Sequence, residues 1–131
     1  MTLFLKQNVL KVKSNHNYST EEIARMVEVY IKENFAHEIN FELIAQNFNF
    51  NSSYLSKLFT KHIGENPSKY LISLRINKAK YLLINQKELS VKEIGEIVGY
   101  PNQYHFSHMF KIFTGKSPAN FKEIPIHIKD E

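Results

Sequence analysis

Residues 66–85, NPSKYLISLRINKAKYLLIN, form the longest stretch of the sequence that suits a single helix. Pro67 fits the first helical position, where its missing N–H costs no hydrogen bond, and Asn66 before it is a good N-cap. Apolar side chains recur at three- and four-residue spacing, as on one face of a helix. The predicted stripe, interrupted only by Lys78, consists of Leu71, Leu74, Tyr81 and Leu82, and the apolar surface is widened by Tyr70, Ile72, Ile76, Ala79 and Leu83. The stretch therefore predicts one long helix that ends near Asn85 and connects two flanking segments.

Shorter helices are predicted on both sides of this long helix, because apolar residues recur with a helical period between capping residues. The expected ranges before it are residues 20 to 34–37, 41–48 and 52–62, and those after it are 91–98, 103–114 and a short helix from 118. Ser19 and Glu22 have the spacing of a capping box. Phe106, Met109, Phe110 and Phe113 are expected to face the core of the C-terminal segment. The sequence thus predicts an all-α fold.

The two flanking segments are copies of one pattern, with one residue inserted in the second copy. The aligned pairs include Ala45 with Gly95, Asn49 with Gly99, Phe59 with Phe110, and Gly64 with Gly115. A small residue in a helix, followed four positions later by a residue that accepts a positive φ, is typical of the helix-turn-helix of DNA-binding proteins. A single match would be weak, since helical hairpins are common, but two matches joined by one helix favour DNA binding.

The composition excludes several classes of function. The chain of 131 residues contains no Cys, which removes disulfides, thiolate catalysis and Cys-ligated zinc. No Ser–His–Asp order, pair of acids or phosphate-binding loop stands out, so an enzyme is not expected. The sequence has no signal-peptide pattern and no apolar run of about 18 residues, so the expected location is the cytoplasm.

The net charge of +4 is distributed unevenly along the chain. Residues 20–48 contain six acidic and two basic side chains, whereas residues 51–82 contain one acidic and six basic side chains. Residues 102–122 contain three lysines and no acid. A chain polarised in this way can present one surface to a polyanion and keep another away from it, which indicates nucleic acid as a partner.

Three parts of the sequence together resemble the DNA-binding domain of the AraC/XylS family of transcription regulators. They are residues 44–64 (IAQNFNFNSSYLSKLFTKHIG), 70–83 (YLISLRINKAKYLL) and 94–122 (IGEIVGYPNQYHFSHMFKIFTGKSPANFK), and the resemblance extends over about residues 20–124. It implies an all-α fold of about seven helices, with two helix-turn-helix subdomains at residues 19–65 and 86–124, a linker helix at 66–85, a tail or linker remnant at 1–18, and a tail at 125–131. The chain departs from the family pattern with Gly95 in place of Ala, Lys122 in place of Arg, and Thr60 where the second repeat has Lys111.

The resemblance also implies which residues contact DNA, and the same residues are expected opposite the apolar face of each helix. The candidates for base contacts are Ser53, Ser56, Lys57, Gln103, Tyr104, Ser107 and His108. The candidates for phosphate contacts are Ser52, Thr60, Lys61, Asn102 and Lys111. Capping is an alternative role for Ser52 and Asn102, and packing at the domain edge is an alternative for Tyr104. His105 and His108 have a spacing that metal ligands use, but no acid converges on them in the local sequence, so neither a metal nor a cofactor is expected.

The expected partner is double-stranded DNA, joined by RNA polymerase where the protein acts as an activator. The resemblance leaves open whether the chain is a small stand-alone regulator or the C-terminal DNA-binding domain of a larger one. The apolar stretch from Leu3 to Val12 favours the larger protein, and the second repeat resembles regulators of sugar utilisation in low-GC Gram-positive bacteria. The chain by itself is expected to be monomeric, and dimerisation is left to the full-length protein. A helical module that binds only proteins is the remaining alternative.

Overall fold

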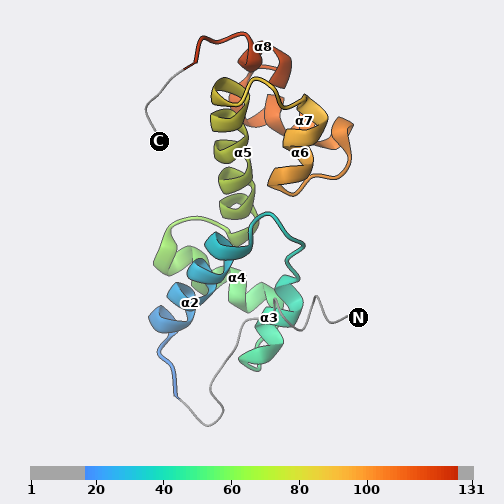
Figure 1. Ribbon diagram of the computed structural model, residues 1–131. Helices are drawn as coiled ribbons and strands as arrows, with labels where there is room; N and C mark the ends of the chain where they lie inside the picture. Colours follow the sequence, from blue (N-terminus) through green and yellow to red (C-terminus); the bar gives the residue numbers. More distant parts are fainter. Residues whose placement is uncertain (1–16, 127–131) are drawn as a thin grey trace. The chain divides into compact units, whose positions relative to one another are not determined.

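The computed structural model describes residues 17–126, which form seven α-helices and no strand, as the sequence predicts (Figure 1). The helices are α2 (Thr20–Asn34), α3 (Phe41–Asn47), α4 (Ser52–Ile63), α5 (Pro67–Asn85), α6 (Val91–Val98), α7 (Gln103–Thr114) and α8 (Pro118–Lys122). The apolar stretch from Leu3 to Val12 lies outside the described residues. No helix within the described range is long and apolar enough to cross a membrane.

The described residues divide into two compact units. The first comprises residues 17–34 and 38–71, and the second comprises residues 35–37 and 72–126. The long helix α5 contributes its first residues to the first unit and its remaining residues to the second. Each unit contains one of the two predicted helix-turn-helix segments, α3–α4 in the first and α6–α7 in the second.

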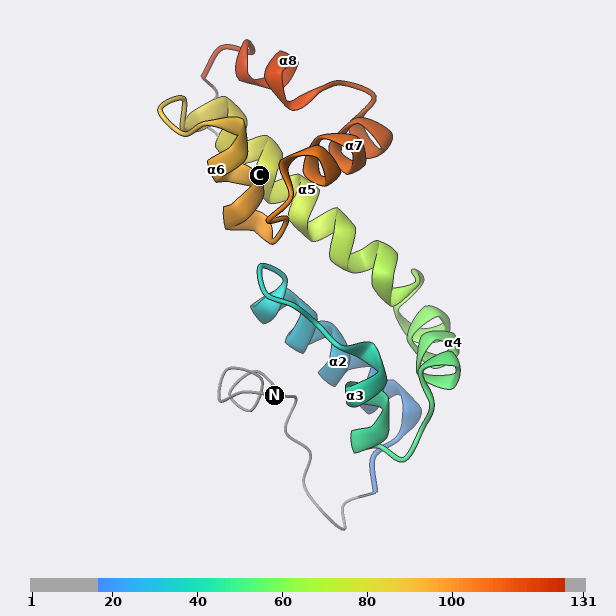
Figure 2. The same ribbon diagram turned by 90° about the vertical axis from the view of Figure 1, so that its right-hand side faces the viewer.

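In the first unit, α2 and α3 both pack against α4 (Figures 1 and 2). The fully buried side chains include Val27 of α2 and Leu55 and Phe59 of α4. The Phe59 ring also packs edge-on against Tyr70 of α5, with ring centroids 5.6 Å apart. The apolar positions that recur along α2 and α4 therefore meet in one core.

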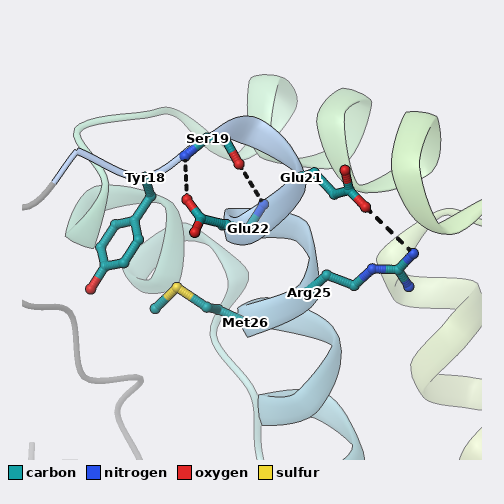
Figure 3. A pocket seen from close by; sticks show the side chains of 6 residues that line it. All are labelled: Tyr18, Ser19, Glu21, Glu22, Arg25 and Met26. Atoms are coloured by element: carbon teal, nitrogen blue, oxygen red, sulfur yellow. Dashed lines mark hydrogen bonds and ion pairs between the residues drawn. The ribbon is translucent and has the colours of Figure 1, made fainter.

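The start of α2 has the predicted capping box, which Figure 3 shows. The backbone N–H of Ser19 donates to the Glu22 carboxylate at 2.8 Å, and the backbone N–H of Glu22 donates to the Ser19 hydroxyl at 3.1 Å. An open pocket beside this turn is lined by Tyr18, Ser19, Glu21, Glu22, Arg25 and Met26. No candidate for DNA contact lines this pocket.

One acidic residue of α2 has a partner inside the first unit. Glu28 accepts a hydrogen bond of 2.7 Å from the Tyr70 hydroxyl, and its carboxylate lies 3.4 Å from Arg25 and 3.7 Å from Lys32. The Tyr70 hydrogen bond and the two charges lower the pKa of Glu28, against the opposing effect of burial. Burial and the Glu28 carboxylate in turn raise the pKa of Tyr70. This hydrogen bond connects α2 to the first residues of α5.

Replacing Tyr70 by Phe is expected to lower the free energy of unfolding by about 1–2 kcal/mol at pH 7, because Glu28 loses its hydrogen bond. A carboxyl group whose folded-state pKa is lowered stabilises the fold above its unfolded pKa, and this contribution is lost as the pH falls through the folded pKa. The difference between wild type and Tyr70→Phe should therefore shrink below about pH 4. Urea unfolding of both proteins over a pH series measures it, and a difference that does not change with pH would contradict the role of the Glu28 charge.

In the second unit, α6, α7 and α8 gather around the later part of α5 (Figures 1 and 2). The rings of Phe106 and Phe110 are fully buried with centroids 5.8 Å apart, and Phe121 packs edge-on against Phe110 at 5.0 Å. The helices α6 and α7 cross closely at Gly95, where a Cβ would lie 3.0 Å from the Phe106 ring and the ring would have to shift slightly to accommodate it. The departure from Ala at this position thus accommodates a large ring where the first unit has Leu55.

Arg75 of α5 fixes the segment of the second unit that follows α2. Its Nε donates to the carbonyl of Phe35 at 2.7 Å, and its Nη2 donates to the carbonyl of His37 at 2.9 Å. The guanidinium also lies over the Tyr100 ring, 5.1 Å from the centroid. A Cβ at Gly99 would lie 2.9 Å from Arg75 Nε, so the helix-turn-helix turn approaches this cation closely. Arg75 therefore has a structural role in the second unit.

Lys122, the last residue of α8, likewise binds backbone carbonyls of a distant segment. Its ammonium donates to the carbonyls of Lys87 at 2.9 Å and Leu89 at 2.6 Å. Lys87 donates in return to the carbonyls of Lys122 and Ile124. A lysine can therefore occupy this position, where the family pattern has Arg, because the groups that it binds are single carbonyl oxygens.

Two expectations about the core are wrong. The buried hydrophobic residues of α5 are Leu71, Ile76, Ala79, Leu82 and Leu83. Leu74 and Tyr81 of the predicted stripe are only half-buried, whereas Lys78, which interrupts the stripe, is exposed. The helix serves two cores in succession, so its buried side chains do not follow a single line. Phe113 is 37% exposed, because it lies in the last turn of α7 at the rim of the core.

Candidate nucleic-acid interface

The turns of the two helix-turn-helix segments share a left-handed residue and a closing hydrogen bond. Asn49 and Gly99 adopt positive φ angles of 62° and 109°. The residue after each of them closes the turn with a backbone hydrogen bond, from Phe50 to the Ala45 carbonyl at 2.9 Å and from Tyr100 to the Gly95 carbonyl at 2.7 Å. The predicted internal repeat is therefore present in three dimensions, and its left-handed turn positions are those that the sequence indicates.

The second helix of each segment also begins in the same way. The side-chain oxygen of Asn51 accepts from the backbone N–H of Tyr54 at 2.8 Å, and that of Asn102 accepts from the backbone N–H of His105 at 3.0 Å. Asn102 thus has the role of a cap through its Oδ1, which leaves its side-chain NH2 group as the donor for the predicted phosphate contact. Ser52 is the first residue of α4 and not its cap. The N–H groups of the first two residues of each helix have no intrahelical partner and remain available to an anion.

The candidate residues of α4 line the side of the helix away from Leu55, Leu58 and Phe59. Ser53, Lys57, Thr60 and Lys61 are exposed, and Ser52 and Ser56 are half-buried. The Thr60 hydroxyl donates to the Ser56 carbonyl at 2.8 Å, so its proton is used within the helix. Lys57 and Lys61 are therefore the two cationic donors that α4 exposes to solvent.

The candidate residues of α7 include more residue types than those of α4, with an amide, a phenol, a hydroxyl, an imidazole and an amine. Gln103, Tyr104, His108 and Lys111 are exposed, and Ser107 is half-buried. Tyr104 is 86% exposed, so it does not pack at the domain edge. In each unit the candidates share one polar helix surface that carries hydrogen-bond donors and acceptors.

Sequence reasoning assigned no DNA role to two rings at the start of these helices. Tyr54 packs edge-on against Phe50 with centroids 4.6 Å apart, and His105 packs edge-on against Tyr100 at 5.2 Å. The signal that could have identified them is the repeat itself, since an aromatic residue in the turn precedes a second ring in both copies. Within residues 17–126, no group of three or more His, Asp or Glu side chains could hold a metal ion.

Comparison with known proteins agrees with this geometry. A family described as "Helix-turn-helix domain" matches residues 44–124, which include both helix-turn-helix segments and the linker helix. The chain is similar to the C-terminal domain of AraT, a response regulator from Geobacillus stearothermophilus, with a TM-score of 0.72 and 31% identity, over 83% of this chain and 92% of that one.

Two curated relatives have related sequences. The Msm operon regulatory protein of Streptococcus mutans is 34% identical over 82% of this chain and 38% of its own length. The raffinose operon transcriptional regulatory protein RafR of Pediococcus pentosaceus is 31% identical over 87% of this chain and 39% of its own length. The chain thus spans less than two fifths of either relative. With the repeated turn geometry and the matched family, these similarities show that the chain belongs to the AraC/XylS family of helix-turn-helix transcription regulators.

Proposed function

We propose that the chain binds double-stranded DNA in a sequence-specific manner, with α4 and α7 as recognition helices in successive major grooves. The observation that carries this proposal is the repetition of turn, cap and polar surface in the two units. α5 has 19 residues, which corresponds to a length of about 28 Å. Successive major grooves on one face of DNA lie ~34 Å apart. A small bend in the DNA, at a cost of a few kcal/mol, would make up the difference.

The two recognition helices should differ in how strictly they select bases. Gln103 of α7 can pair with adenine through two hydrogen bonds, and Lys57 of α4 favours the O6 and N7 atoms of guanine. Ser53 and Ser56 accept several bases. We therefore expect α7 to discriminate more strongly than α4.

The chain fits the DNA-binding part of a longer bacterial regulator, which acts in the cytoplasm, where the chromosome lies. The support is that it spans less than two fifths of its two curated relatives and nearly all of the C-terminal domain of AraT. The name of RafR refers to raffinose, which supports a sugar-responsive regulator. If the protein activates transcription, RNA polymerase is its second partner.

Replacing Gln103 or Lys57 by Ala is expected to weaken operator binding by about 1–3 kcal/mol for each variant. Both side chains are exposed, so the fold should not change. Fluorescence anisotropy with an operator selected from random DNA and a scrambled duplex measures the loss, and circular dichroism checks the helix content. Gln46→Ala, at an exposed position of α3, and Lys32→Ala, on α2, are matched controls that should bind normally.

Unchanged operator binding by both Gln103→Ala and Lys57→Ala would contradict this assignment of the DNA-binding surface. Salt separates DNA binding from the alternative of a protein-binding module. The operator affinity should fall steeply with salt concentration, because Lys and Arg contacts to phosphates release counterions.

A further inference from the structure

Tyr54 and His105 occupy the same place in the two units. Each is the third residue of its recognition helix, and each gives its backbone N–H to the capping Asn. Each ring stands edge-on against the aromatic residue of the preceding turn, at interplanar angles of 74° and 85°. Backbone and ring are therefore fixed in the same way in both units, although the residue types differ.

The polar ends of these two rings have no partner in the described part of the chain. The Tyr54 hydroxyl and the His105 imidazole make no hydrogen bond among residues 17–126, and both side chains reach solvent, with Tyr54 45% exposed. Packing against the turn would require only an apolar ring. A ring that carries a hydrogen-bond donor at the same exposed position in both units indicates a function for the donor.

The helical positions place these donors beside the predicted base-reading residues. Tyr54 precedes Lys57 by three residues and Lys61 by seven, so the three side chains share one side of α4. His105 precedes His108 by three residues in the same manner. Each ring also touches the turn, so it lies at the border of the helix surface and not at its centre. When a recognition helix lies in the major groove, its border faces the sugar–phosphate backbone.

We propose that Tyr54 and His105 are matched DNA-backbone contacts, each donating from its exposed ring to a phosphate beside its recognition helix. Phosphate oxygens only accept hydrogen bonds, and a phenol O–H and an imidazole N–H are suitable donors. This inference rests on the proposed function, since it requires α4 and α7 to bind DNA.

The proposed phosphate contacts of Tyr54 and His105 differ in the cationic side chains that lie beside them. The position seven residues after Tyr54 holds Lys61, whereas the equivalent position after His105 holds Ile112, which is 60% exposed. The border of α7 therefore lacks the lysine that α4 has. The Tyr100 ring, against which His105 packs, carries the Arg75 guanidinium over its face, 5.1 Å from the centroid. Loss of the His105 donor should consequently weaken DNA binding more than loss of the Tyr54 hydroxyl.

The test uses Tyr54→Phe and His105→Phe, which keep a ring against the turn and remove the donor. Binding of the whole chain to its operator and to a scrambled duplex is measured at several salt concentrations. We expect each variant to lose about three- to tenfold in affinity for both duplexes, with the preference for the operator unchanged, and we expect the larger loss for His105→Phe. Tyr81→Phe, on α5 outside the recognition helices, is the control that should bind normally.

A second variant separates the donor from the ring. His105→Tyr keeps both, so it should bind nearly as well as wild type, and binding as weak as that of His105→Phe would overturn the proposal. Unchanged binding by Tyr54→Phe and His105→Phe would also overturn it, since the rings would then only support the turns. A loss confined to the operator would point to base contacts and equally reject a phosphate contact. A wild-type chain that binds neither duplex would instead refute the proposed function itself.

Discussion

Inserting four alanines after Asn77 of α5 is expected to lower operator affinity at least ~100-fold while both units stay folded. Four residues add about 6 Å to a helix and turn its far end by about 40°. The recognition helix that follows the insertion would then miss the groove and the phosphates that the operator offers. With only one recognition helix in its groove, the variant should bind the operator hardly better than non-specific DNA. Non-specific affinity is typically weaker than specific affinity by 10³-fold or more.

The insertion is compared with Asn77→Ala, which changes the same exposed position without changing the length of α5. This control should bind the operator normally. Equal helix content by circular dichroism in wild type, control and insertion variant would show that the loss is one of geometry. Operator affinity that survives the insertion would mean that the two units do not bind DNA together.

Replacing Phe110 by Ala is expected to destabilise the second unit by about 3–5 kcal/mol. The Phe110 ring is fully buried between Phe106 and Phe121, at 5.8 Å and 5.0 Å, so its removal leaves a cavity that these rings cannot easily fill. For a unit of this size the loss corresponds to a fall in melting temperature of more than ~10 °C. Thermal unfolding followed by circular dichroism measures it.

Phe113→Ala provides the matched control on the same helix. Its ring is 37% exposed, so the same substitution should cost much less than Phe110→Ala. Equal melting temperatures for the two variants would show that Phe110 is not part of the core described above. The comparison also distinguishes Phe110 from Phe113, although the sequence pattern predicts both residues to lie in the core.

The features that could be predicted from the sequence are those that depend on neighbouring residues. The capping box of Ser19 and Glu22 is confirmed by two hydrogen bonds, and Gly64 and Gly115 adopt the left-handed conformation that ends their helices. The positive φ of Asn49 also follows from its residue type and its place after a helix. Propensity and capping act within one or two turns of chain, so a single sequence contains them.

The features that could not be predicted depend on packing between distant segments. A periodic pattern assumes one buried face, and α5 has two cores to serve, so Leu74 and Tyr81 are only half-buried although they have the predicted spacing. The bonds from Arg75 to the carbonyls of Phe35 and His37 join positions 38 to 40 residues apart. Nothing in the local sequence around either segment indicates them.

The candidate DNA surface was predicted in part. Lys57, Gln103 and Tyr104 are exposed on the recognition helices, as an outward-facing position requires, and their contacts with bases stay predictions. The Thr60 hydroxyl donates to the Ser56 carbonyl, whereas the cap at Asn102 uses only its side-chain oxygen and leaves its NH2 group to donate. Residue types that bind DNA phosphates also form hydrogen bonds with the protein's own backbone. Only the three-dimensional structure distinguishes the two roles.

The most direct test of DNA binding by two helices is a selection of bound sequences from random duplexes of about 40 base pairs, performed with the wild-type chain. We expect two enriched sequence blocks whose centres lie about one helical turn, ~10 base pairs, apart. In the same selection with Gln103→Ala, only the block read by α7 should weaken. A single enriched block, or no enrichment at all, would contradict the claim that α4 and α7 read DNA together.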